Sequence, residues 1–342
     1  MKKFCLVLIA VLAMQAVCIA HPEDMPKKAE GEAVKAGQFV LKNPRLTVEV
    51  MKPGDEKAAY AGSRFEWGAT VLQVTLDGKH TFCSAENPGS RFHGYGLAEE
   101  MGIGGPVGFK QENNKQFLKI GVGIFKTNGF PYNFGATYKT ARKLDWKVEV
   151  NAEKTKATFV QVLKDFEGWG YRYEKRIVLD PKLAQMKLEH VLENTGTKPI
   201  KTDQYCHHFM IFDKQRTGPD YVATFPFKTK LSQPNTLVVA KGNDITWKKP
   251  VEGGSYYAII EGYAAKAEDN EFVLRHKPSG LAVRISGDFA LSRLPLWGRP
   301  DNICFEPFIA INLEPGKKMA WTRTYGFAKK GEEPPVAKAA KK

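Results

Sequence analysis

The stretches Tyr171–Leu179, YRYEKRIVL, and Gln185–Glu193, QMKLEHVLE, alternate apolar and polar side chains. A period of two residues places one face of each stretch in a core and the other in water, which is typical of β-strands. Similar short runs recur from Gln38 to Phe327, separated by turn signals such as Asn194-Thr195-Gly196. The sequence therefore predicts an all-β chain.

The strand runs belong to one region, residues 38–328, which contains no low-complexity linker and no sustained helical period. We expect a single large antiparallel β-sandwich. The stretch Leu97–Met101 has room for one helical turn. Residues 21–37 are expected to form a disordered lead, and residues 329–342, rich in Lys, Ala and Pro, a disordered tail.

The N-terminal residues 1–20 are predicted to be a signal peptide. A positive start, Met1-Lys2-Lys3, precedes an apolar run that ends in the small residues Cys18-Ile19-Ala20. Cleavage after Ala20 is favoured, and an uncleaved anchor is the alternative. No later segment is long and apolar enough to span a membrane. We expect an exported bacterial protein, periplasmic or secreted.

Cysteine content and charge narrow the functional classes. Cys83, Cys206 and Cys304 follow the signal peptide, so at most one disulfide can form among them, and whether Cys206 pairs with Cys304 stays open. The formal net charge is +14, but the basic residues are spread along the chain rather than gathered in one stripe. Nucleic-acid binding is therefore not expected, whereas affinity for acidic glycans or the envelope is.

The run Tyr205–Asp213, YCHHFMIFD, places two histidines in an apolar stretch. Neighbours on a strand point to opposite faces, so His207 and His208 are not expected to bind one ion. No Cys-x-x-Cys or His-x-His supplies further ligands, and no metal site is predicted. From this run alone, a hydrogen-bonded core histidine is favoured over a functional one.

A second run, Ile303–Phe308, ICFEPF, places the carboxylate of Glu306 between apolar residues. Such a carboxylate is costly to ionise unless it is partnered or used in chemistry. A glutamate exposed at a strand end is the alternative.

The order of these motifs resembles the aldose 1-epimerase (galactose mutarotase-like) superfamily. Asn194–Ile200 leads into the histidine run, and Cys304–Pro307 precedes a Pro-Gly turn and a last strand ending in Tyr325-Gly326-Phe327. The likeness extends from about Arg64 to Phe327. It implies the superfamily's large supersandwich fold, with His207 and Glu306 as the catalytic residues. Cys206 stands where the family pattern has asparagine, and Phe308 where it has glutamine.

The resemblance implies anomer interconversion of a monosaccharide or oligosaccharide, without cofactor or metal. In that reaction Glu306 takes the proton of the C1 hydroxyl and His207 delivers one to the ring oxygen, the two groups facing each other across a space the width of a pyranose. We expect burial to raise the pKa of Glu306 and the nearby carboxylate to keep His207 protonated. His208 is assigned a structural role on the opposite face.

Further residues are expected to bind the sugar, most of them because of their side-chain type and their closeness to the matched segments. These are Glu99, Glu100, Lys119, Tyr132, Asp269 and Trp297. For Asp269 the resemblance implies a substrate contact, and a simple turn is the alternative.

Glu99 and Glu100 are placed on a loop at the edge of a cleft. Two alternative functions remain: a non-catalytic carbohydrate-binding protein of the same fold, and a relative of polysaccharide lyases or glycosidases, the latter using Glu306 with Glu99 or Glu100. A phosphosugar epimerase is not favoured for an exported protein. The identity of the sugar and the oligomeric state stay open.

Overall fold

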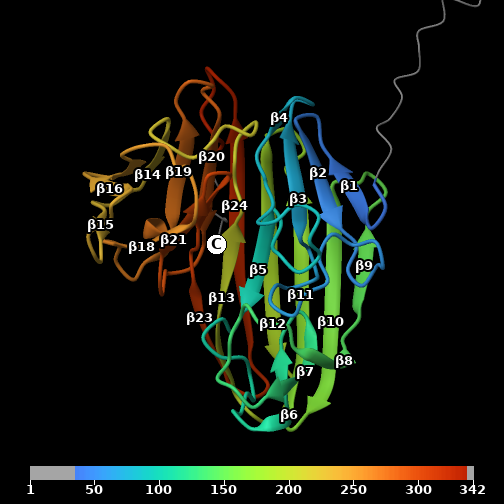
Figure 1. Ribbon diagram of the computed structural model, residues 1–342. Helices are drawn as coiled ribbons and strands as arrows, with labels where there is room; N and C mark the ends of the chain where they lie inside the picture. Colours follow the sequence, from blue (N-terminus) through green and yellow to red (C-terminus); the bar gives the residue numbers. More distant parts are fainter. Residues whose placement is uncertain (1–34, 337–342) are drawn as a thin grey trace, which may run out of the picture. The chain divides into compact units, whose positions relative to one another are not determined.

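The computed structural model describes residues 35–336, whose regular secondary structure is almost entirely antiparallel β-strand (Figure 1). This confirms the predicted all-β class. Within that range the sole helical element is a short 3-10 helix, η2 (Ala267–Asp269), and no helix there has the length and apolar character needed to cross a membrane. The predicted signal peptide and most of the predicted lead lie outside the described residues.

One large sheet contains seven strands in the order β1-β2-β3-β5-β13-β23, with β4 attached to β3. Its strands are β1 (Gln38–Lys42), β2 (Leu46–Met51), β3 (Val71–Leu76), β4 (His80–Thr81), β5 (Leu97–Met101), β13 (Ile200–His208) and β23 (Ile309–Leu313).

A second large sheet contains ten strands in the order β16-β17-β14-β19-β20-β24-β12-β11-β10-β9. Its strands are β16 (Val238–Lys241), β17 (Asp244–Trp247), β14 (Tyr221–Thr224), β19 (Glu271–His276), β20 (Ala282–Gly287), β24 (Lys318–Ala328), β12 (Gln185–Asn194), β11 (Trp169–Leu179), β10 (Lys156–Phe166) and β9 (Trp146–Val150). The two alternating stretches of the sequence become the neighbours β11 and β12, with Tyr173 opposite Leu192.

Two smaller sheets complete the domain. One has four strands: β15 (Lys230–Leu231), β18 (Tyr256–Glu261), β21 (Pro295–Arg299) and β22 (Asn302–Phe305). The other has three: β6 (Asn113–Lys119), β7 (Gly123–Asn128) and β8 (Lys139–Lys143).

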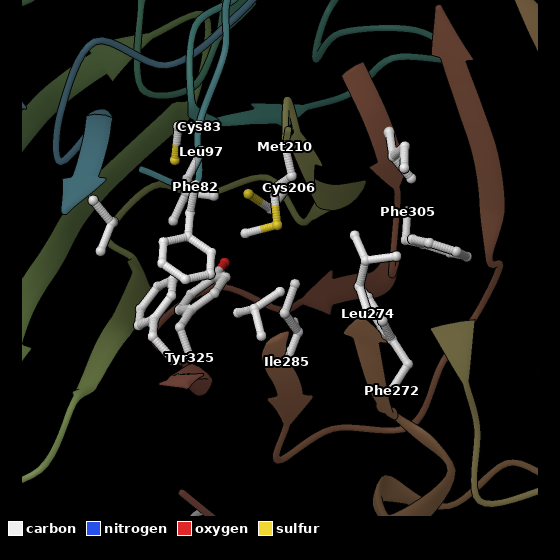
Figure 2. Packing of buried hydrophobic residues seen from close by; sticks show 14 of the residues in the cluster. Phe82, Cys83, Leu97, Cys206, Met210, Phe272, Leu274, Ile285, Phe305 and Tyr325 are labelled. Carbon is white, nitrogen blue, oxygen red and sulfur yellow. The ribbon is translucent and has the colours of Figure 1, made fainter. Parts of the chain in front are cut away.

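The main core lies between the two large sheets. Val48 and Leu76 from the seven-stranded sheet and Ile177 and Leu188 from the ten-stranded sheet are all buried in one hydrophobic cluster. Figure 2 shows part of this cluster, in which Cys206 of β13 packs among apolar side chains from both sheets. Each fully buried side chain of this size contributes roughly 1.5–3 kcal/mol relative to its exposed state, so the alternation along the strands drives the sandwich together.

The helical turn expected at Leu97–Met101 is wrong, because these residues form β5 in the middle of the seven-stranded sheet. All five are buried, so the strand has two covered faces and lacks the alternation that would have marked it. Gly96 precedes it with a φ of 56°, and a Cβ at this position would lie 2.0 Å from the carbonyl oxygen of Val71. Only glycine fits that approach.

The described ends of the chain contact the domain. Gly37 accepts a hydrogen bond from the amide of Lys52, although it was assigned to the lead. Residues 329–336, assigned to the tail, also pack: Glu332 forms an ion pair with Arg45 at 3.0 Å, and the carbonyl of Val336 accepts a bond from Gln185. Contacts with the sheets therefore continue to residue 336, and residues 337–342 lie outside the described range.

Candidate functional site

Strand β13 places the two histidines on opposite faces, as expected from strand geometry. It pairs with β5 on one side and β23 on the other, so its register is held from both edges. His208 points into the sandwich, where its Nε2 lies 3.0 Å from the hydroxyl of Tyr325 and its Nδ1 contacts the carbonyl of Phe305. His207 points to the other face, together with Tyr205.

Glu306 follows the end of β22, and its amide donates to the carbonyl of Pro295 at 2.9 Å. Its Oε1 lies 3.0 Å from Nε2 of His207. The structure therefore brings together the two residues predicted as catalytic, one from mid-chain and one from near the carboxyl end. They are in direct contact, however, whereas the sequence predicted a space the width of a pyranose between them.

Aromatic rings hold the imidazole of His207. It is stacked on Phe209 with 4.1 Å between ring centroids, and it makes T-shaped contacts with Phe65 and Trp297, whose ring centroids lie 5.9 and 5.2 Å away. Its Nδ1 is buried and has no hydrogen-bond partner among residues 35–336. The ring is therefore fixed by packing and by one polar contact, the one with Glu306.

Burial favours the neutral forms of both groups. Loss of solvation raises the pKa of Glu306 from 4.5 to about 7. Burial, assisted by the positive charge of Arg64, lowers the pKa of His207 well below 6.5. The pKa of Glu306 shifts in the expected direction, but that of His207 does not, because burial and the charges of Arg64 and His208 all disfavour a protonated imidazole. These shifts favour a neutral imidazole next to a carboxyl group that titrates near neutral pH.

The pair opens into a pocket of about 420 Å³, a size within the range of small-molecule sites. Phe134 and Tyr257, 45% and 51% exposed, stand at its outer part, whereas His207 and Glu306 are only 4% and 6% exposed. The lining residues are Arg64, Glu86, Ile103, Gly104, Phe134, His207, Tyr257, Arg293, Trp297 and Glu306.

Of the six residues expected to bind the sugar, Trp297 lines this pocket and the other five do not. Glu100 is fully buried, where its carboxylate bonds Lys119 at 2.7 Å and Arg64 at 2.9 Å. Lys119 also donates to the hydroxyl of Tyr132 at 2.9 Å. Asp269 accepts a bond from the amide of Ala264 and closes the turn around η2.

Glu99 lies on β5 rather than on a loop and points between the two large sheets. Its carboxylate contacts Lys175 at 2.7 Å, His190 at 2.9 Å and Arg323 at 3.0 Å. Burial alone would raise its pKa, but His190 and Lys175 hold it well below 4.5. Glu66 pairs with the same lysine at 2.9 Å. This buried ion-pair network joins the sheets and does not reach the pocket, so Glu99 and Glu100 supply no second carboxylate for glycoside hydrolysis there.

Sequence reasoning missed most of the pocket lining, notably Arg64, Tyr257 and Arg293. Arg64 stands at the start of the region that resembles the superfamily, which was a signal for its neighbourhood. Tyr257 and Arg293 carried no such signal, because they reach the pocket through pairing between distant strands.

Solved structures with the same fold are readily found. The chain is similar to a galactose mutarotase related enzyme from Lactobacillus acidophilus (14% identity, 87% of this chain and 100% of that one, TM-score 0.56). It is also similar to galactose mutarotase-like proteins from Lactobacillus casei (13%, 85% and 100%, 0.52) and Clostridium acetobutylicum (10%, 85% and 94%, 0.52). No protein-family model and no curated protein matches. The chain therefore has the galactose mutarotase-like sandwich fold.

Proposed function

We propose that the protein is an exported aldose 1-epimerase-like enzyme that interconverts the α and β anomers of a free sugar. The observation that carries this proposal is the contact of 3.0 Å between His207 Nε2 and Glu306 Oε1 at the inner end of a pocket. A carboxyl group and an imidazole in contact can act as the acid and the base that this reaction needs.

Opening of the sugar ring moves one proton from the C1 hydroxyl to the ring oxygen. Both oxygens are bonded to C1, so two side chains that lie next to each other can serve them at the same time. Protonated Glu306 gives its proton to the ring oxygen while Nε2 of neutral His207 takes the proton of the C1 hydroxyl, and the C1–ring oxygen bond breaks as the carbonyl forms. After rotation about C1–C2 the ring closes on the other face and both protons return.

These roles are the reverse of those implied by the resemblance, and they follow from the protonation states that burial favours. Open-chain sugar is then bound beside a carboxylate and an imidazolium, which stabilise each other at their contact distance. The stacked Phe209 keeps the imidazole in place, and the half-buried ring of Trp297 offers an apolar face to the C–H groups of a sugar.

Export is part of the proposal and is supported by the leader-like character of residues 1–20. Expression of the full chain in a bacterium, followed by N-terminal sequencing of the periplasmic form, tests it. A mature protein that begins at His21 is expected, and an uncleaved cytoplasmic protein would contradict export.

Polarimetry tests the enzymatic activity. Freshly dissolved α-glucose, α-galactose and α-galacturonic acid are followed with the wild type, His207→Ala and Glu306→Gln, with Glu314→Gln at an exposed turn as the matched control. We expect the wild type and the control to accelerate relaxation of at least one sugar, and each pocket variant to lose about 10²–10⁴-fold in kcat. If no sugar relaxes faster than in buffer, the enzyme proposal is wrong, and sugar binding that Glu306→Gln leaves unchanged would favour the carbohydrate-binding alternative.

A lyase is the second candidate, because Tyr257 lies in the same pocket as His207 and Arg293. A tyrosine that abstracts a proton would need a lowered pKa, but burial raises that of Tyr257, with only partial relief from Arg293. We therefore expect no unsaturated uronate, measured by ultraviolet absorbance, when the protein is incubated with pectate or alginate.

A further inference from the structure

Arg293 has an unusual position in the pocket. Its guanidinium carbon lies 4.0 Å from the centre of the Phe308 ring, and that ring is stacked in turn on Tyr205, with 4.3 Å between centroids and 11° between planes. A guanidinium that lies on an aromatic face keeps its N–H groups free to bond in its own plane. Phe308, which replaces the glutamine of the family pattern, thus forms a platform for a cation.

The backbone fixes Arg293 relative to the proposed catalytic pair. The amide of Phe308 donates to the carbonyl of Arg293, and the amide of Ser292 donates to the carbonyl of Phe308, both at 2.9 Å. Glu306 lies two residues before Phe308, and both Glu306 and Arg293 line the pocket. The guanidinium therefore occupies the same pocket as Glu306, and the backbone bridge to Phe308 holds the main chain of Arg293 there.

The guanidinium of Arg293 has no protein acceptor. No hydrogen bond or ion pair joins its side chain to another residue in the range 35–336, although it is only partly exposed. Arg64, in contrast, bonds the carboxylate of Glu100 and the hydroxyl of Tyr205. The positive charge of Arg293 acts to lower the pKa of Asp203 and of Glu306, but neither carboxyl group lies within ion-pair distance of it. The N–H donors of this partly buried guanidinium are therefore available to an acceptor that a ligand brings into the pocket.

We infer that the pocket selects a sugar that carries an anionic group, a carboxylate or a phosphate, and that Arg293 binds this group while C1 lies against His207 and Glu306. This inference rests on the proposed function for the position of C1. Guanidinium forms paired, charge-assisted hydrogen bonds with either anion, which is why the two share one recognition chemistry. The positive net charge of the chain, +14, would also favour the approach of anionic sugars.

Kinetics with matched sugars test the inference. We would measure kcat/KM for anomerisation of galactose, galacturonate and galactose 6-phosphate by the wild type, Arg293→Gln, Arg293→Lys and Arg142→Gln, the last removing an exposed charge on β8. For the preferred anionic sugar, Arg293→Gln should lower kcat/KM about tenfold to a hundredfold, the loss expected for a charged hydrogen-bonded contact, and should leave galactose within about threefold. Arg293→Lys should retain part of the activity and Arg142→Gln all of it.

The comparison between galacturonate and galactose 6-phosphate identifies the anion. If galactose is turned over as well as both anionic sugars, or if Arg293→Gln lowers all three equally, anion selection is wrong while the epimerase activity stands.

Equilibrium binding separates failure of the inference from failure of the proposed function. Calorimetric titration of the same three sugars into the wild type and Arg293→Gln needs no turnover. Tighter binding of an anionic sugar than of galactose, weakened about tenfold or more by Arg293→Gln, would support the inference even in a protein that catalyses nothing. Equal binding of all three sugars, or binding that Arg293→Gln does not change, would overturn it.

Discussion

Replacement of Glu306 by glutamine should make the protein more stable, and the gain should grow with pH. The carboxyl group has a pKa of about 7 in the folded protein instead of 4.5, because burial penalises its charged form. As the pH rises between these two values, the unfolded chain loses this proton while the folded protein retains it. Stability therefore falls across this window, and the full penalty is present above it.

The size of the effect follows from the shift. One unit of pKa corresponds to 1.36 kcal/mol, so the ionised carboxylate costs the folded state about 3 kcal/mol at a pH above both values. Glutamine has nearly the same shape and keeps a hydrogen-bonding partner for His207, but it has no charge to bury. The lowered pKa of His207 acts in the opposite direction, and it is caused mainly by burial, which both proteins share.

Urea unfolding at about pH 5 and about pH 8 measures this difference. We expect the advantage of Glu306→Gln over the wild type to increase by about 2 kcal/mol between the two conditions. Glu314→Gln, at an exposed turn, should show no comparable change. An advantage that is the same at both pH values, or a loss of stability at the higher one, would refute the assignment of a buried, raised-pKa carboxyl group.

Three further predictions concern other parts of the molecule. The kcat/KM for anomerisation should fall as the pH rises through about 7, because Glu306 must carry a proton to act as the acid. A kcat/KM that rises across this range, after subtraction of buffer catalysis, would contradict that role. In a urea titration, Glu99→Ala should lower the free energy of unfolding by about 3–5 kcal/mol, since it leaves Arg323 and Lys175 with an uncompensated buried charge. The control Glu314→Ala should change the free energy of unfolding by less than about 0.5 kcal/mol. Cys83, Cys206 and Cys304 are buried free thiols, so peptide mapping after treatment with a thiol reagent should find them labelled only in unfolded protein, and labelling of the native protein would show that they are accessible.

The fold class could be predicted because most strands have one face in a core and one in water. β11 and β12 show this alternation plainly and lie side by side in the large sheet. Strand β5 could not be recognised in this way, since both of its faces are covered and its two glutamates are hidden in ion pairs. A strand buried on both sides carries no period that distinguishes it.

The candidate pair could be identified because both residues stand in short motifs whose order resembles a known superfamily. The rest of the pocket could not, because side-chain type does not reveal which face of a strand a residue occupies. Charge was the reason for expecting sugar ligands in Glu99, Glu100 and Lys119, yet all three form ion pairs in the interior of the protein. Arg293, which the sequence did not single out, reaches the pocket through its pairing with Phe308.

The most direct test of the account follows the two anomers at equilibrium. Exchange spectroscopy of the anomeric protons of an aldose or uronate measures the rate at which the α form becomes the β form, without any net reaction. Addition of the wild-type protein should produce exchange between the two anomeric signals, and His207→Ala and Glu306→Gln should each abolish it. Anomeric signals that exchange no faster with the wild type than with buffer, for neutral and anionic sugars alike, would contradict the claim that these two side chains move a proton between the C1 hydroxyl and the ring oxygen.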